Sequence, residues 1–302
     1  SRIRPTKRVT LYPGKQFWVN NSGVLPEGGI GGSDTNDGTY LRPLSTIDGA
    51  IGKCKANRGD IICVMPGHAE DVASAGAIAC DVAGVAIVGL GLGTKRPTIS
   101  FTTATAAAIT VSAANVTLHN MIFNANFADV NAAIVPTAAN CTLSYCNFKQ
   151  AGADLNFVDY ITPSGAANTA DGLTVDHCTG YGVDAAINSP LSITDDLQDL
   201  VFTHNRFNTD NANALAMIVS ATGKDLNNAY VAHNYYASLK TSGDVLVDND
   251  TTANDGWVAH NRVMGLNTSG EVLADLTGVG NFDNLGTGAV DASGYLLPAA
   301  DS

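Results

Sequence analysis

The pattern of apolar and polar positions repeats along most of the chain. The segments "LVFTHNRF" (200–207), "AYVAHNYY" (229–236) and "GWVAHNRVM" (256–264) each place apolar residues two apart, continue with His-Asn, and then return to an apolar or aromatic residue. Three earlier segments align with these copies: "VTLHNMIF" (116–123), "CTLSYCNF" (141–148) and "LTVDHCTG" (173–180). Successive copies start 25, 32, 27, 29 and 27 residues apart. Alternation with a period of two is typical of short β-strands.

The repeat length predicts the fold class. A period near 27 residues excludes α-solenoids, whose repeats are longer and show helical periodicity, and the Leu/Asn spacing of leucine-rich repeats is absent. The pattern therefore predicts an all-β fold, a single-stranded right-handed parallel β-helix in which each repeat forms one rung. We expect a solenoid of roughly 8–9 rungs, with neighbouring rungs about 4.8 Å apart.

The His-Asn pairs fall at equivalent positions of successive rungs, so we expect them to form two files along the rod. The predicted structural ladder contains His177, His204, His233, His260, Asn205, Asn234 and Asn261. Asn tolerates unusual backbone angles at a turn, and amides on stacked strands can hydrogen-bond to one another. Metal binding and catalysis stay open as alternatives. A zinc ion needs three or four ligands, whereas a straight file offers two at most, so the structural ladder is favoured.

The residues before the repeats predict a cap for the open end of the β-helix. Residues 1–44 read as a basic N-terminal arm with a Gly/Asp-rich lead-in, and residues 45–58 as a capping helix. Ser45 or Thr46 can cap this helix, and its apolar residues share one face. We expect the β-helix itself over residues 59–285 and a C-terminal tail over residues 286–302.

Composition and charge narrow the function. The chain is 45% hydrophobic and only 15% charged, which suits a turn-rich β protein with a large core. Residues 1–59 hold nine Lys and Arg against four Asp and Glu, a net charge of +5, whereas the remaining residues hold a net charge of −17. An acidic body of this size argues against nucleic acid as a partner. No apolar run reaches the roughly 18 residues needed to span a bilayer, and the N-terminus lacks the apolar stretch of a secretory signal, so we expect no membrane partner.

Candidate chemistry along the chain is weak. Glycoside hydrolysis needs two facing carboxylates, and the best adjacent pairs, Asp195 with Asp196 and then Asp248 with Asp250, are more typical of turns. His68 and Glu70 read as a loop contact rather than an acid/base couple. The Gly-rich stretch 28–43 lacks the spacing of a calcium loop or a nucleotide-binding loop.

The six cysteines show no metal-ligand spacing, so most read as small core residues of a reduced, cytoplasmically made protein. A single bridge between Cys146 and Cys178 stays open, because they fall on neighbouring rungs. Taken together with the weak candidate chemistry, these observations lead us to expect no catalytic, cofactor-binding or metal-binding residues, and no enzymatic activity.

A family resemblance rests on "GSDTNDGTYLRPLSTIDGAI", "RGDIICVMPGHAED", "VAIVGLGLGTKRPTI" and "NVTLHNMIF". These segments resemble β-helix proteins encoded beside the major capsid gene of tailed bacteriophages, over roughly residues 16–150. The first segment occurs in many β-helix proteins and marks the fold only, while the "MPGHAE" and "GLGTKRPTI" continuations are more particular to the phage group. The resemblance implies a virion structural protein that decorates or cements the capsid. It brings no catalytic residues with it.

The sequence therefore predicts a non-enzymatic virion protein bound to the outer capsid surface, with the major capsid protein as its partner. We expect docking through the basic arm, whose cations are Arg2, Arg4, Lys7, Arg8 and Lys15. A homotrimer is expected, assembled in the host bacterial cytoplasm. The alternative is a tail spike or receptor-binding β-helix that acts on or binds host polysaccharide. The low aromatic content, 7%, does not support a sugar-binding groove, and a secreted adhesin is disfavoured because no signal is visible.

Overall fold

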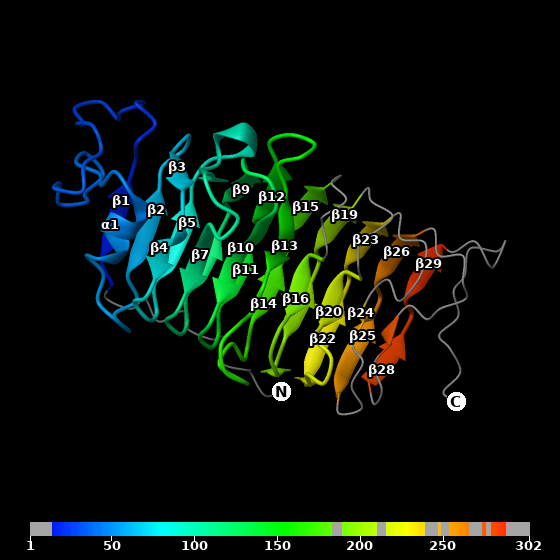
Figure 1. Cartoon of the computed structure of the whole chain (residues 1–302). Coiled ribbons are helices and arrows are strands. Elements are labelled where there is room, and N and C mark those ends of the chain that lie inside the picture. The colour runs from blue at the N-terminus through cyan, green and yellow to red at the C-terminus, as the bar shows by residue number, and fades with distance from the viewer. Residues whose placement is uncertain are drawn as a thin grey trace, which may run out of the picture.

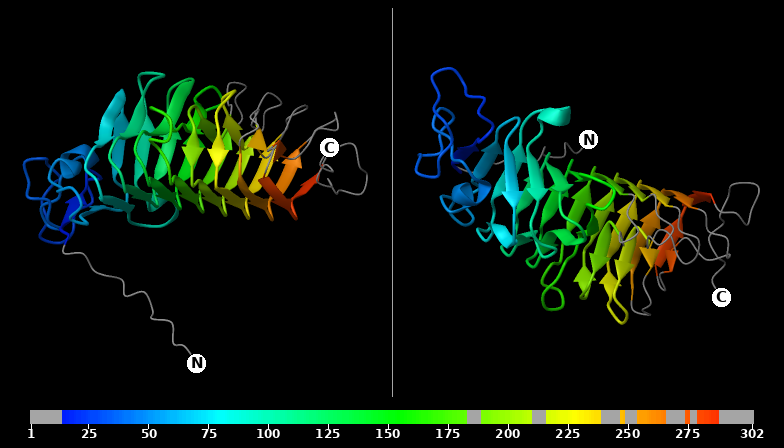
Figure 2. Two further views of the ribbon diagram at one scale, coloured as in Figure 1. Left: turned by 90° about the horizontal axis from the view of Figure 1, so that it is seen from below. Right: turned by 45° about the horizontal axis from the view of Figure 1, so that its top comes forward.

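The computed structural model describes residues 14–182, 189–209, 216–238, 247–248, 254–265, 274–275 and 279–287. Over these residues the chain winds as a right-handed parallel β-helix, and every pairing between its named strands is parallel (Figure 1). The two further views show strands of successive rungs side by side along one axis (Figure 2). The predicted fold class is confirmed, and no helix among the described residues is long and apolar enough to cross a membrane.

Three long sheets run along the rod. The first sheet contains β1 (Gln16–Val19), β2 (Ile61–Val64), β5 (Ala86–Gly89), β8 (Thr117–His119), β11 (Thr142–Ser144), β14 (Thr174–Asp176), β18 (Val201–Thr203), β22 (Ala229–Ala232), β25 (Gly256–Ala259) and β28 (Val279–Phe282). The second sheet contains β3 (Ala69–Val72), β6 (Thr98–Phe101), β9 (Ile122–Ala125), β12 (Asn147–Gln150), β15 (Thr179–Gly182), β19 (Arg206–Thr209), β23 (Tyr235–Ser238), β26 (Arg262–Gly265) and β29 (Leu285–Thr287).

The third sheet contains β4 (Ala75–Cys80), β7 (Ala108–Val111), β10 (Val130–Pro136), β13 (Phe157–Ile161), β16 (Leu191–Ile193), β20 (Ile218–Ser220), β24 (Val247–Asp248) and β27 (Ala274–Asp275). A small fourth sheet pairs β17 (Leu197–Gln198) with β21 (Leu226–Asn227), and a short 3-10 helix spans Gly93–Lys95. Each rung passes from the first sheet through a corner into the second, then into the third, as β8, β9 and β10 do.

The core fills the inside of the coil. In β12 and β19 the inward side chains, Phe148 and Phe207, are fully buried, while the residues on either side of them face outward. The Phe148 ring stacks on Tyr160 with 4.9 Å between ring centroids, and Tyr160 lies 5.6 Å from Phe207. Gly180 leaves the space for these rings, because a Cβ added there would lie 2.5 Å from Tyr160 Cε2. The interior therefore accepts large rings where the inward position of a neighbouring rung holds a small residue.

The N-terminal end is covered by helix α1 (Ile47–Ile51), as the sequence predicts. Thr46 caps it, since its hydroxyl oxygen accepts the Gly49 N–H at 3.0 Å. Ile47, Ala50 and Ile51 are buried against the first rungs. The helix is shorter than the 45–58 segment expected for it, because the chain turns after Gly52.

The lead-in predicted over residues 1–44 contains the first strand of the coil, β1. It pairs in parallel with β2 at the end of the first sheet, so the β-helix begins before the capping helix rather than at residue 59. The buried Asp60 fixes this start, because its carboxylate accepts the Lys15 N–H at 2.7 Å and pairs with Arg58 at 2.6 Å. Burial opposes its charge, yet these hydrogen bonds lower the pKa of Asp60 to about 2.

Candidate functional site

The corner between the first and second sheets is made by one residue per rung in the left-handed conformation. These residues are Asn120, Tyr145, His177, His204, His233, His260 and Asp283, with φ of 57°, 55°, 53°, 55°, 60°, 56° and 47°. Positive φ is uncommon outside glycine, and Asn and His adopt it more readily than most other residues. The four histidines of the predicted ladder therefore lie at the corner itself, where the backbone needs such residues.

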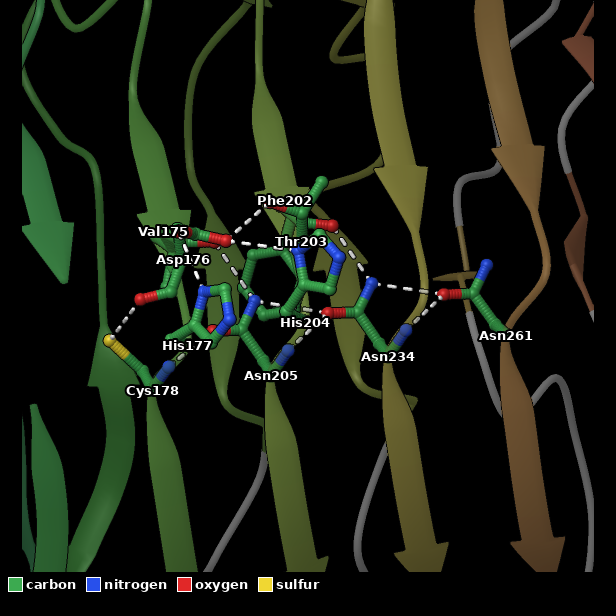
Figure 3. Close-up of polar contacts among 10 residues, drawn as sticks. All are labelled: Val175, Asp176, His177, Cys178, Phe202, Thr203, His204, Asn205, Asn234 and Asn261. Atoms are coloured by element: carbon green, nitrogen blue, oxygen red, sulfur yellow. Dashed lines mark hydrogen bonds and ion pairs between the residues drawn. The ribbon is translucent and has the colours of Figure 1, made fainter. Parts of the chain in front are cut away.

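A ladder of buried asparagine side chains lies just inside this corner (Figure 3). The Asn234 carbonyl oxygen accepts both the backbone N–H and the side-chain N–H of Asn205, at 2.9 and 3.0 Å. Asn234 donates in turn to Asn261 with the same two groups, both at 2.9 Å. Each side-chain amide also donates to a backbone carbonyl of the preceding rungs, as Asn234 does to the Phe202 carbonyl at 2.8 Å. Every buried donor at this corner thus has a partner.

The ladder extends one rung further than the sequence pattern indicated. Asn284 accepts the backbone and side-chain N–H groups of Asn261, both at 2.9 Å, and donates to the Val258 carbonyl. It was missed because Asp283 stands at the corner position there, where the preceding rungs have His. Toward the N-terminus the ladder stops at Cys178, whose backbone N–H donates to the Asn205 side chain at 2.8 Å. Cys178 and Cys146 are free thiols on neighbouring rungs.

The histidine rings stack outside the corner and stay about half exposed. The centroid distances are 4.7 Å from His177 to His204, then 5.1 Å to His233 and 5.1 Å to His260. The interplanar angles of these pairs are 16°, 14° and 10°, and Tyr145 extends the stack 4.8 Å beyond His177. The file is therefore a continuous column of flat rings on the surface of the rod.

Asp176 brings three possible metal ligands together at this corner, with His177 and His204. Its two carboxylate oxygens lie 2.8 Å from His177 Nδ1 and 3.2 Å from His204 Nδ1 (Figure 3). Burial opposes its charge, but hydrogen bonds from His177, Thr203 and His204 hold the pKa of Asp176 below its usual range. Zinc prefers four ligands in a tetrahedron, and the described residues offer three that already bond to each other. The geometry favours a carboxylate that orients two stacked rings.

The other candidates from the sequence serve contacts between rungs. Asp195 pairs with Lys224 of the next rung at 2.8 Å, and Asp196 accepts the Asp225 N–H at 3.1 Å. Asp250 lies outside the described residues, and of Asp248 only the backbone is described. Asp195 and Asp196 line one small hollow of about 10 Å³, which holds no more than about one water molecule.

His68 and Glu70 join the first rungs to helix α1. The buried His68 ring accepts the Asn21 N–H at 3.2 Å, and its other nitrogen lies 3.0 Å from the Glu70 carboxylate. That carboxylate accepts the Ile47 N–H at the start of α1, at 2.9 Å. Glu70 also lines an open hollow of about 700 Å³, together with Asp48. Since its carboxylate already holds the helix, the pair works here as a structural link.

The third sheet carries one buried acid. Asp159 is 8% exposed, and its carboxylate accepts the N–H and hydroxyl of Ser189 at 3.1 and 3.3 Å. Burial raises its pKa to about 6. It lines a mostly apolar hollow of about 460 Å³ with side chains such as Val158 and Thr162. A raised pKa in a hollow suits proton transfer, but no second carboxylate lines this one, so the paired acids of glycoside hydrolysis are not present there.

The outer face of the second sheet is the arrangement that sequence reasoning missed. We call it the cationic face, and define it by Lys149, Tyr181, Arg206, Tyr235 and Arg262. Arg206, Tyr235 and Arg262 each come directly after Asn in the repeated His-Asn pair, so register places them on neighbouring rungs. The arginine guanidinium of Arg206 lies 5.2 Å from the centre of the Tyr235 ring. The sequence repeat already contained evidence of this face, since these three residues stand one position after the asparagines of the ladder.

No protein-family model matches the sequence, and no curated protein matches it. Solved structures that are similar include a rhamnogalacturonan lyase, with a TM-score of 0.47 and 12% identity, over 91% of this chain and 74% of that one. A GH136 lacto-N-biosidase from Eubacterium ramulus gives a TM-score of 0.31 as its selenomethionine derivative, at 10% identity. The native form gives 0.30 at 12% identity. Both matches cover 90% of this chain and 68% of the other. Likeness at this level of identity concerns the fold alone.

The expectation that this chain is not an enzyme is wrong on this comparison. The similar solved structures are enzymes by name, a lyase and a biosidase. The expectation came from the lack of recognisable site motifs, among them a pair of carboxylates facing a single sugar, and from a resemblance that carries no catalytic residues. A paired-carboxylate site is only one way to build an active site. The likeness itself assigns no reaction and no substrate to the residues described above.

The asparagine ladder predicts a large loss of stability for Asn234→Ala. This change removes the acceptor of two buried N–H groups of Asn205 and one donor to the Phe202 carbonyl, so we expect the free energy of unfolding to fall by roughly 3 kcal/mol or more. Denaturant titration measures it. The control is His233→Asn, which keeps a residue suited to positive φ and removes one ring, with an expected change within about 1 kcal/mol. Equal losses in the two variants would contradict the ladder.

The buried Asp159 predicts that stability falls as pH rises. Its folded-state pKa of about 6 lies above the ordinary value of 3.8, so the folded protein holds this proton more tightly than the unfolded chain. The free energy of unfolding should therefore fall by about 3 kcal/mol between pH 4 and pH 7, from this group alone. Asp159→Asn should remove that contribution. If the free energy of unfolding changes equally with pH for wild type and variant across this range, the assignment is contradicted.

Proposed function

We propose that this chain is a structural component of a bacteriophage virion, which binds the outer surface of the capsid as a decoration or cement protein. The observation that carries the proposal is the separation of charge. Residues 1–59 have a net charge of +5 and the remaining residues −17. A basic segment on an acidic body suits docking to another acidic surface, while the body itself is repelled by it. The resemblance to β-helix proteins encoded beside capsid genes supports the same partner, the major capsid protein.

The place of the basic segment in the chain also supports the proposal. Residues 1–13, with Arg2, Arg4, Lys7 and Arg8, lie outside the described residues and precede Gly14 directly. Lys15, the fifth predicted docking residue, belongs instead to the folded start of the coil, where its backbone N–H bonds to Asp60. Its side chain is exposed at the end of the first sheet. Docking through the other four residues would hold the rod by this end.

The proposal extends to a homotrimer on the virion surface, assembled in the host bacterial cytoplasm. A rod with flat sheets along its sides can pack against copies of itself around a three-fold axis. The third sheet is the side best suited to such packing, because the hollow that crosses it is lined mostly by Ala, Val and Thr side chains.

Deleting residues 1–13 should abolish binding to the capsid and leave the fold intact. The deletion removes four positive charges and keeps the Lys15 hydrogen bond to Asp60. Co-sedimentation with capsids of the source phage measures binding, and thermal melting measures the fold. The matched control is Lys53→Glu with Lys55→Glu, which alters the same net charge within the folded region. Unchanged binding of the deletion variant would overturn docking through the arm.

Light scattering should give the mass of three chains for the purified protein at micromolar concentration. Each chain has a mass of 31.1 kDa, so monomer and trimer are well separated. Val158→Glu places a charge in the hollow of the third sheet and should convert the trimer to a monomer. A monomeric wild-type protein would contradict a trimer free in solution.

A further inference from the structure

Positive charge gathers on the cationic face, where the hollows among the described residues are lined by no carboxylate. Only seven of the chain's Lys and Arg lie beyond residue 59, and three of them, Lys149, Arg206 and Arg262, lie on this face. Within the described residues none of the three has an ion-pair partner. The face therefore presents unpaired positive charge on a body whose net charge is −17.

Two hollows join along the face. One, of about 370 Å³, is lined by Lys149, Gln150 and Tyr181 among others, and a second of about 290 Å³ is lined by Tyr181, Arg206 and Tyr235. Tyr181 and Asn147 belong to both, so the hollows form one furrow that crosses β12, β15, β19 and β23. No carboxylate lines either hollow.

The side chains in the furrow are positioned for recognition. The Arg206 guanidinium lies over the Tyr235 ring, and the Tyr235 hydroxyl donates to the Met264 sulfur at 2.8 Å, so the arginine sits on an anchored ring. Tyr181 is 49% exposed. Asn147 donates to the Thr179 hydroxyl at 2.5 Å, and its buried carbonyl oxygen has no hydrogen-bond partner among the described residues. The furrow thus offers two aromatic rings and two cations to a ligand.

We propose that the cationic face binds an extended anionic polysaccharide, one that carries carboxylates on its sugar units. Arg and Lys recognise the carboxylates, Tyr rings pack against the apolar faces of the sugars, and the amides bond to hydroxyl groups. Successive rungs repeat at about 4.8 Å, so an extended polymer lying along the rod would cross one rung after another at a regular interval.

The occupant is a polysaccharide rather than a nucleic acid. Binding to nucleic acid depends on neutralising many phosphates, and this face offers three cations on a protein whose net charge is −12. This function goes beyond attachment to a capsid, since it uses the outer face of the second sheet and none of the four basic residues that precede Gly14. A rod held at one end would leave the face open to a polysaccharide of the host cell surface.

Isothermal titration with the full chain tests the proposal. The probes are oligomers of polygalacturonate, alginate and hyaluronate, with dextran as the neutral polymer and a single-stranded DNA oligomer as the other polyanion. We expect binding to at least one of the three carboxylate polymers and none to dextran. Arg206→Gln and Tyr181→Ala should each weaken it roughly tenfold, since each removes a charge-assisted bond or a ring contact.

The control is Lys53→Gln with Lys55→Gln, which removes positive charge away from the face and should leave affinity unchanged. Melting curves verify that each variant is folded, as expected because Arg206 and Tyr181 are exposed. The proposal is overturned if none of the three polymers binds at millimolar concentration, or if DNA binds more tightly than all of them. Equal losses in the control and face variants would also overturn it. Co-sedimentation of the same variants with capsids is measured as well, so that failure of polysaccharide binding can be distinguished from failure of the docking proposal.

Discussion

The left-handed turn between the first and second sheets is the constraint on which the rest of the structure depends. A β-helix keeps its sheets in register only if every rung bends at the same place and by the same amount. Here the bend needs positive φ at one residue per rung, and it leaves backbone N–H groups directed into a dry corner. The corner residue meets the first need, and asparagine at the next position meets the second, because its side-chain oxygen accepts from one neighbouring rung and its side-chain N–H donates to the other.

The corner also decides where functional side chains stand. Two residues after each left-handed position, the side chain faces outward at the start of the second sheet, as Arg206 and Arg262 do. A fixed bend therefore converts a repeat in the sequence into a straight file on the surface. The histidine stack is one such file, and the cationic face lies beside it on the same rungs.

Much of this architecture could be predicted from the sequence, because the His-Asn repeat reports the corner directly. The positions of His177, His204 and His233 along one file follow from counting rungs. The early start of the coil at β1 could not be predicted, since Gln16–Val19 shows no repeat and its pairing with β2 skips the whole lead-in and capping helix. Asn284 was missed for a similar reason, because an aspartate replaced the histidine that marked the pattern.

The cationic face could be predicted only in part. Arg206, Tyr235 and Arg262 each follow the Asn of the repeated pair, so counting rungs could have placed them on one file. Lys149 and Tyr181 lie two positions further along their strands, and only the pairing of strands brings them beside that file. The pKa of Asp159 likewise depends on Ser189 from the next rung and on burial that no short segment reveals. Periodicity identifies the scaffold, whereas charge and burial depend on how inserted loops place distant residues.

The asparagine ladder has one more consequence, which concerns how such a chain can change its length over evolution. Each rung presents to the next the same acceptor that it receives from the one before, as Asn205, Asn234 and Asn261 do in turn. A duplicated or deleted repeat would therefore find matching groups on both sides without any redesign of its neighbours. The length of the rod is free to vary by whole units, while its two ends and its surface files keep their chemistry.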